Sequence, residues 1–224
     1  MSRSKIFYSD AYKEIEKAIM KTLNEQQDFL SDATAGSTRA VGDAIQAIVA
    51  ANFAEILGPL GADYSSEFAR RAMADLAFAD ADGLYCVVDV KTHRIGTAFS
   101  MPNLISVERL ATFYEDDKNV FAVLMVKYAV NGTKTDVREV RFVPIEFLDW
   151  GCLTVGALGW GQIQIANANS ITIRDKFSRK KWMLELCDAM LSFYPKEVLK
   201  IEKRVIRFQK VKEFWSQKSD DPGA

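Results

Sequence analysis

Two aspartates and a lysine near the middle of the chain are the residues best suited to chemistry. Asp89 and Lys91 end the apolar run "LYCVVDVK", which is typical of a half-buried β-strand, and their spacing of two places both side chains on one face. Asp75 precedes a second apolar run, and the turn-forming segment 80–83, Asp-Ala-Asp-Gly, separates the two runs. A hairpin centred on Asp82 would place Asp75 and Asp89 directly opposite each other.

Facing carboxylates repel each other unless a cation lies between them. Asp75 and Asp89 could therefore share one divalent ion such as Mg²⁺, which prefers oxygen ligands and keeps several waters. Lys91 could then orient an attacking water or balance the charge of a phosphate. The alternative is a plain ion pair between Asp89 and Lys91, since Asp-x-Lys is a common pattern that occurs again at residues 116–118.

The bulk composition is that of an ordinary globular protein. The chain has 224 residues, of which 49% are hydrophobic and 26% are charged. This length suits a single domain over residues 1–218, followed by a flexible tail over 219–224. The formal net charge of −1 gives no support for nucleic-acid binding, which would have to use a local basic patch.

Cysteine and histidine usage narrows the chemistry further. Cys86, Cys152 and Cys187 are far apart and show no zinc-type spacing, so we expect free thiols in a reducing cytoplasm. His93 is the only histidine, which excludes a histidine-rich metal centre. Neither a signal-peptide core nor an uncharged apolar segment of membrane-spanning length is evident, so we expect a bacterial-type intracellular protein with no membrane partner.

The order of the expected elements predicts a mixed α/β (α+β) layered domain, with a central mixed sheet flanked by helices. Ser9 can cap a helix over residues 10–30, and a second helix follows over 39–57. A short third helix is expected over 65–73, and Asn131-Gly132 predicts a hairpin between two long strands. From Arg179 the chain is helical and basic, with a break between two helices at Pro195.

The spacing of Asp75, Asp89 and Lys91 resembles the signature of the PD-(D/E)xK nucleases, although Ala74 stands where a proline is usual. "DVKTHRIGTAFSMPNLIS" (89–106), "ALGWGQIQI" (157–165) and "VGDAIQAIV" (41–49) resemble segments of the blunt-cutting, EcoRV-like type II restriction endonucleases that include HincII and HpaI. The three blocks occur in the same order and cover most of the chain between residues 40 and 190.

This resemblance implies a restriction-endonuclease-like core and a restriction-modification enzyme. It would hydrolyse double-stranded DNA within a short palindrome and leave blunt ends with 5′-phosphates. One or two Mg²⁺ ions and no organic cofactor are implied. Asp75, Asp89 and the Val90 carbonyl would be the metal ligands, with Lys91 as a catalytic residue. Gln46, with Asp43 one turn earlier, lies where related enzymes often have a glutamate. A homodimer is implied, with the N-terminal helices as its expected interface.

The resemblance also implies that three groups of polar residues bind DNA. Polar residues after the catalytic strand could contact the DNA backbone or groove: Thr92, His93, Arg94, Ser100 and Asn103. Amides further along could read base edges: Gln162, Gln164, Asn167 and Asn169. Nearby glycines such as Gly156 would let DNA approach the backbone, and a phosphate clamp could be formed by Arg179, Lys180 and Lys181. A solvated turn, amides that satisfy a sheet edge and a solvated basic helix face are the alternatives for these three groups.

Two other functions fit the same residues. A repair or recombination nuclease with this core would cut by DNA structure, and the amide-rich "QIQIANAN" segment favours sequence reading over that. In a non-catalytic DNA-binding protein, Asp75, Asp89 and Lys91 would form a structural charge cluster.

Overall fold

A computed structural model describes residues 4–26, 28, 30–64, 74–97, 100–156 and 161–218. The chain divides into two compact units, Met1–Phe177 and Ser178–Ala224, which are described separately below. The short helix expected over 65–73 and the tail over 219–224 lie outside the described residues, as does part of the 157–165 block.

A five-stranded mixed sheet, ordered β1-β2-β3-β5-β6, is the centre of the first unit. Strands β3 and β5 are parallel, and the other neighbours are antiparallel. The strands are β1 (Gly61–Tyr64), β2 (Leu76–Asp80), β3 (Tyr85–Arg94), β5 (Asn119–Asn131) and β6 (Lys134–Pro144). The predicted mixed α/β class, with a mixed central sheet flanked by helices, is confirmed.

Both predicted hairpins are present, and the one between β2 and β3 is tightly held. Asp80 is 1% exposed, and its carboxylate accepts hydrogen bonds from the backbone N–H groups of Asp82 and Leu84, both at 2.9 Å. Its other oxygen accepts one from the Ser4 hydroxyl at 3.0 Å. Gly83 has φ of 76°, a left-handed conformation that suits glycine. These local bonds fix the turn and therefore the register of the two strands.

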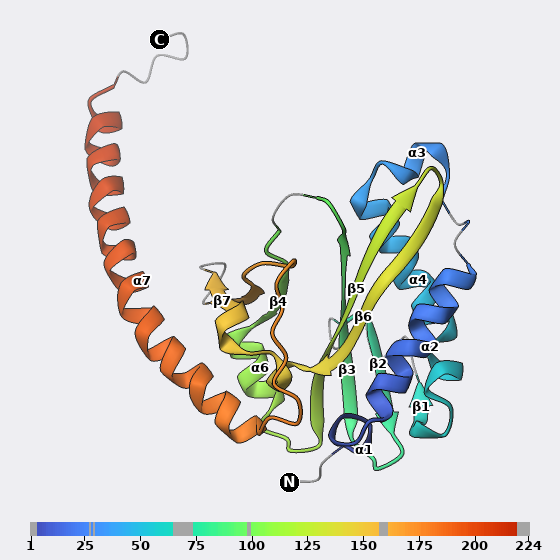
Figure 1. Cartoon of the computed structure of the whole chain (residues 1–224). Coiled ribbons are helices and arrows are strands. Elements are labelled where there is room, and N and C mark those ends of the chain that lie inside the picture. The colour runs from blue at the N-terminus through green and yellow to red at the C-terminus, as the bar shows by residue number, and fades with distance from the viewer. Residues whose placement is uncertain are drawn as a thin grey trace. The chain divides into compact units, whose positions relative to one another are not determined.

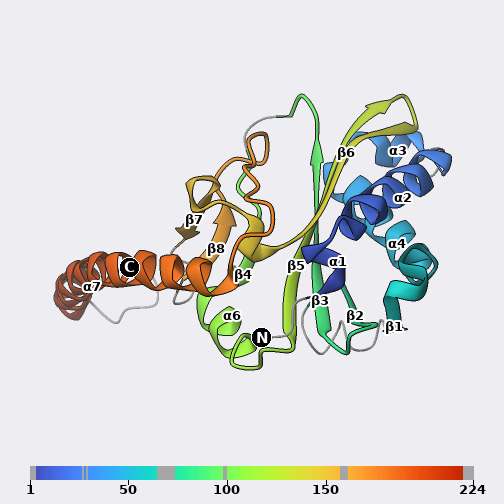
Figure 2. The same cartoon turned by 60° about the horizontal axis from the view of Figure 1, so that its bottom comes forward.

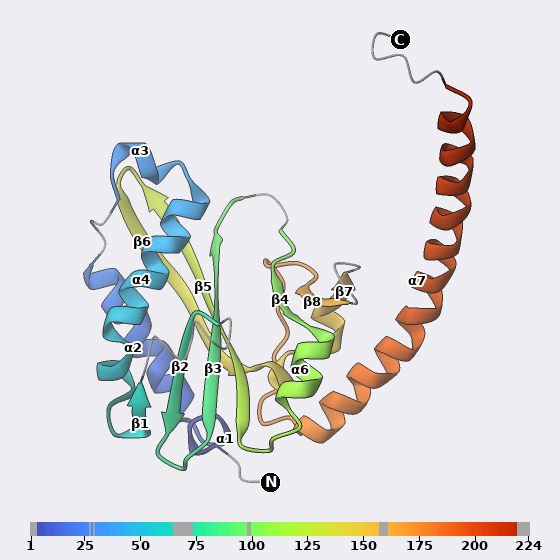
Figure 3. The same ribbon diagram turned by 180° about the vertical axis from the view of Figure 1, so that it is seen from behind.

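Helices cover one face of this sheet, and Figures 1 and 3 show α2 and α4 packed there side by side. The helices before the sheet are α1 (Lys5–Tyr8), α2 (Ala11–Glu25), α3 (Asp32–Ala35) and α4 (Thr38–Leu57). Helix α2 buries Ile15, Ile19 and Leu23, as their spacing predicts, but ends sooner than expected. The Ser9 hydroxyl accepts a hydrogen bond from the Ala11 N–H at 3.1 Å, although Asp10 is the capping residue.

Helix α4 is strongly apolar, although no membrane-spanning segment was expected from the sequence. Among the described residues, Thr38–Leu60 has the length and hydropathy that a membrane-spanning helix needs, by composition alone. The core helix of a folded domain passes the same test. Its apolar stripe of Val41, Ile45, Val49 and Phe53 recurs every four residues and is buried in the first unit. This stripe is the part of α4 that contributes to the core of the first unit.

A smaller antiparallel sheet and a short helix lie beside the other face, as Figure 2 shows. The sheet has the order β4-β8-β7, with β4 (Asn103–Ser106), β7 (Leu153–Gly156) and β8 (Gln162–Ile165). The helix is α6 (Val107–Phe113), and the 3₁₀ turns are η1 (Gly58–Leu60), η2 (Ile145–Phe147) and η3 (Trp150–Cys152). The short strands expected in "GQIQIANANSITIRD" are thus represented by β8.

The second unit consists of one long helix, α7 (Arg179–Ser216), which Figure 1 shows as continuous. The expected break at Pro195 is wrong, because Pro195 lies inside the helix. A proline in a helix interior removes one backbone hydrogen bond and costs about 3 kcal/mol. A helix of 38 residues has enough other bonds to continue through that position.

Candidate active site

The β2–β3 hairpin brings the two predicted carboxylates together. Its register pairs Leu76 with Val88 and Ala77 with Val87, so the next step along the ladder puts Asp75 opposite Asp89. Asp75 itself lies just before β2, and its N–H donates a hydrogen bond to the Val88 carbonyl at 3.1 Å, which holds it beside β3. The observed register agrees with a turn centred on Asp82, and the placement of Asp75 opposite Asp89 is its extension by one residue.

Lys91 and Asp89 lie on the same face of β3 and form an ion pair. The Lys91 ammonium is 2.8 Å from Oδ1 of Asp89, and both side chains are largely buried. Oδ2 of Asp89 is buried and has no hydrogen-bond partner in the described part of the chain. Burial raises the pKa of the Asp89 carboxyl to about 7, Lys91 opposes this shift, and the negative charge of Asp75 adds to it. A buried acceptor without a partner costs free energy, so this oxygen is poised for a cation or a proton.

Both oxygens of Asp75 are held by neighbouring elements. Oδ1 accepts a hydrogen bond from the Gln46 amide on α4 at 2.7 Å, and Oδ2 accepts one from the Val90 N–H at 2.6 Å. Gln46 therefore reaches the site as expected, and it orients a carboxylate. Asp43 is exposed on the same helix and lies 4.0 Å from Arg39. Of the two candidates on this helix, Gln46 is the one in contact with the site.

A glycine allows α4 to come close enough for this contact. A Cβ atom on Gly42, one turn before Gln46, would lie only 2.7 Å from Oγ1 of Thr92. Thr92 thus points at α4, on the opposite face of β3 from Lys91. The expected role of Thr92 is a DNA contact, whereas in this structure its hydroxyl packs against α4.

The donor set suits one hard cation better than several. No group of three histidine, cysteine, aspartate or glutamate side chains among the described residues could hold a metal ion. The charge of Asp75 nevertheless acts on Asp89, and the buried oxygen of Asp89 has no hydrogen-bond partner among the described residues. Mg²⁺ is usually bound through one or two carboxylates, with waters completing its shell. The residues present therefore fit a single Mg²⁺.

A cavity beside Asp89 connects the site to the smaller sheet. It has a volume of about 200 Å³, and its polar lining comes from Asp89, Ser106, Arg109 and Gln162. Gln162 is one of the predicted base-reading amides, so the structure brings it to the same cavity as a candidate metal ligand. Arg109, on α6, was missed by the sequence analysis because no local pattern around it indicates that α6 folds over β3.

The remaining polar residues near the end of β3 are engaged within the protein. His93 is buried, and its Nε2 lies 2.8 Å from Oδ1 of Asn169. Arg94 donates a hydrogen bond to the Ala35 carbonyl at 3.1 Å. These contacts join β3 to the loop after β8 and to the end of α3. Two predicted DNA-binding residues, His93 and Asn169, are therefore brought together as a pair.

Another pair of predicted amides joins the strands of the smaller sheet. The Gln164 amide donates to Oδ1 of Asn103 at 2.6 Å across the β4–β8 pair. A Cβ atom on Gly156 would lie 2.5 Å from Oε1 of Gln164, so this glycine makes room for the amide. Ser100 is exposed, and Oδ1 of Asn167 caps its own turn by accepting a hydrogen bond from the Asn169 N–H at 3.0 Å. The basic residues Arg179, Lys180 and Lys181 begin α7 in the second unit.

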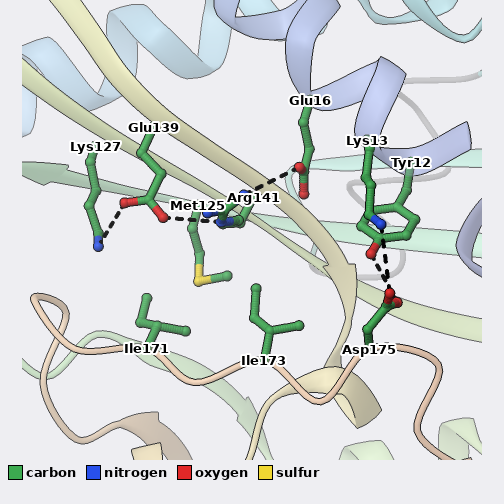
Figure 4. A pocket seen from close by; sticks show the side chains of 10 residues that line it. All are labelled: Tyr12, Lys13, Glu16, Met125, Lys127, Glu139, Arg141, Ile171, Ile173 and Asp175. Carbon is green, nitrogen blue, oxygen red and sulfur yellow. Dashed lines mark hydrogen bonds and ion pairs between the residues drawn. The ribbon is translucent and has the colours of Figure 1, made fainter. Parts of the chain in front are cut away.

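A second cavity, of about 410 Å³, lies on the same unit and is shown in Figure 4. Its charged lining residues are bonded to one another. Arg141 lies 3.0 Å from Glu139 and 3.7 Å from Glu16, and Lys127 also pairs with Glu139. Lys13 and the Tyr12 hydroxyl both contact Asp175. These charged side chains pair with one another. None of Asp75, Asp89 and Lys91 lines this cavity.

Comparison with known proteins adds nothing to this geometry: no family model matches the sequence, and no curated protein matches it.

Proposed function

We propose that this chain is a Mg²⁺-dependent endonuclease that hydrolyses double-stranded DNA at a specific sequence, as a type II restriction endonuclease does. The observation that carries the proposal is the hairpin register. Extended by one residue, this register would put Asp75 opposite Asp89. The Lys91 ammonium lies on one oxygen of Asp89, and the other oxygen is buried with no partner among the described residues. The resemblance of the same segments to PD-(D/E)xK nucleases supports this chemistry over a purely structural cluster.

Each residue would have a distinct task. Asp75 and Asp89 would hold the ion, with the Val90 carbonyl as a third protein ligand. When bound, Mg²⁺ supplies positive charge against the scissile phosphate and acidifies water. Lys91 would orient the attacking water and stabilise the negative charge that develops on the phosphate. Gln46 would keep Asp75 in place through its 2.7 Å hydrogen bond.

Recognition would involve the cavity side of the site. Gln162 would read a base edge, because its side chain shares a cavity with Asp89. Arg109 would contact a backbone phosphate, since a guanidinium pairs with phosphate oxygens in a fixed geometry. Gln164 and Asn103 would act as a bonded pair, each oriented by the other. Symmetric DNA would be matched by a homodimer of this chain.

The test is cleavage of long, unmodified viral DNA by the purified protein, with Mg²⁺ or with EDTA, and with sequencing of the fragment ends. Discrete Mg²⁺-dependent fragments with blunt ends and 5′-phosphates are expected. Lys91→Ala should lower the cleavage rate by about 100-fold or more. Lys118→Ala is the matched control, because Lys118 belongs to the other Asp-x-Lys sequence, where the Asp116 side chain binds the backbone of a turn. It should cleave at the wild-type rate.

The alternatives give different results in the same assay. A smear of fragments without a common sequence would indicate a structure-directed nuclease. Intact DNA on several substrates, together with unchanged behaviour of Lys91→Ala, would refute the proposal and make the Asp89–Lys91 pair structural.

A further inference from the structure

The long helix of the second unit exposes an unusual amount of apolar surface. Of the large hydrophobic side chains that the described residues expose, all but Ile95 and Met101 lie on α7. By contrast, α2 and α4 bury their apolar stripes inside the first unit. Contiguous exposed apolar surface of this kind marks an interaction site.

Most of the exposed residues follow a regular repeat. Seven of the ten large apolar side chains that the described part of α7 exposes fit positions spaced alternately by three and four, which is the a and d pattern of a coiled coil. The other three, Leu199, Ile206 and Phe214, lie outside this repeat. We call the positions of the repeat the α7 seam; they are Leu184, Cys187, Leu191, Tyr194, Val198, Ile201, Val205, Phe208, Lys212 and Trp215. The large aliphatic and aromatic residues of the seam, other than the half-buried Tyr194, are between 44% and 74% exposed. A repeat that spans more than four heptads is long enough to specify pairing with another helix.

We propose that the α7 seam pairs in antiparallel orientation with the α7 seam of a second copy of this chain. This interface is independent of the nuclease function proposed above. The basic residues in the middle of α7 lie at the outer c and f positions, away from the seam. Two copies can therefore pair through the seam without bringing these like charges together, which supports self-pairing. These basic residues are Lys196, Lys200, Lys203, Arg207 and Lys210.

The flanking charges select the antiparallel orientation. With the two-fold axis between Leu199 and Lys200, Glu197 of each helix lies beside Arg204 of the other, since both occupy g positions. In a parallel pair in register, Glu197 would lie beside Glu202 of the other helix, which is repulsive. The antiparallel arrangement therefore gains two attractive pairs where the parallel one has two repulsive pairs.

The single charged residue of the seam, Lys212, also favours the antiparallel orientation. Lys212 would face its own copy in a parallel pair, which would bury two ammonium groups together. In the antiparallel pair it faces Cys187, an exposed free thiol. The same alignment matches Leu191 with Phe208, and Val198 with Ile201, so large residues meet across the seam.

Disulfide trapping tests both the pairing and its orientation on the full chain. Lys212→Cys should form a covalent dimer with Cys187 of the other copy under mild oxidation. Lys210→Cys, on the outer face, is the control and should stay uncross-linked. In the double variant Cys187→Ser/Lys212→Cys, the cross-link should disappear. Its persistence would show parallel pairing, and absence of a cross-link in Lys212→Cys would refute pairing through the seam.

A charge exchange gives a second test, read as mass by light scattering over a range of concentrations. The wild-type chain should form an assembly of at least two 25.2 kDa chains. Glu197→Arg or Arg204→Glu alone should weaken association by about tenfold, and the double variant should restore it. A wild-type chain that stays monomeric would refute the proposal, even if it cleaves DNA. If Glu197→Arg strengthens association, the orientation is parallel.

Discussion

Gly42 allows a sharp test of how the fold positions the candidate site, because two effects of known size oppose each other there. In Gly42→Ala the new Cβ would lie 2.7 Å from Oγ1 of Thr92, so α4 must move away from β3 or Thr92 must leave its preferred conformation. Overpacking of this kind costs about 1–3 kcal/mol. Alanine gains about 1 kcal/mol over glycine in a helix interior. We expect the clash to win, with a net loss of about 1 kcal/mol and a fall in Tm of about 2–4 °C.

The assay is urea and thermal unfolding followed by circular dichroism, with cleavage rate as a second readout. Gly36→Ala is the control, because a Cβ on Gly36 meets nothing within 4 Å and its φ of −77° suits alanine. The double variant Gly42→Ala/Thr92→Ala should lose less stability than the two single variants together, since the clashing oxygen is gone.

Cleavage by Gly42→Ala should fall several-fold, because a displaced α4 carries Gln46 away from Asp75. A Gly42→Ala variant that is as stable as the wild type, or more stable, would contradict this prediction. That result would mean that helix propensity decides the sign and that α4 and β3 are not in close contact.

Three further substitutions test the hairpin, a buried acid and an oriented amide. Asp80→Ala removes three hydrogen bonds to a buried carboxylate, so it should lower the free energy of unfolding in urea by about 3 kcal/mol or more. A loss below about 1 kcal/mol would contradict the role of Asp80 in fixing the register. Burial raises the pKa of Glu16, so the native state holds that proton more tightly, and the unfolding free energy should fall as pH rises through the native pKa. Glu16→Gln should remove this part of the pH dependence when the unfolding free energy is measured from pH 4 to 7. If the unfolding free energy of the variant changes with pH as it does in the wild type, Glu16 is not the source. Gly156→Ala should displace the Gln164 amide and weaken DNA binding without loss of helix content, as measured by fluorescence anisotropy; unchanged affinity would exclude Gln164 from recognition.

The strand pairing at the site could be predicted because it depends on local information. Turn residues between two apolar runs indicate a hairpin, and the alternation of side chains fixes which residues face each other. The β2–β3 register, from which we extrapolate Asp75 to lie opposite Asp89, followed from these rules alone. Alternation also puts Thr92 on the opposite face from Lys91, but it does not say which element covers that face. The close approach of Gly42 on α4 to the Thr92 hydroxyl depends on how a distant helix packs on β3.

By itself, the sequence determined the mixed α/β class, the two hairpins, the helix faces and the acid-x-lysine pair on one face of β3. These features depend on periodicity and turn chemistry, which act over a few residues. Only the tertiary structure decided that one oxygen of Asp89 is buried without a partner among the described residues, that Gln46 holds Asp75, and that Arg109 shares a cavity with Asp89. Burial and hydrogen bonding across elements depend on which distant segments pack together, and no local pattern contains that information.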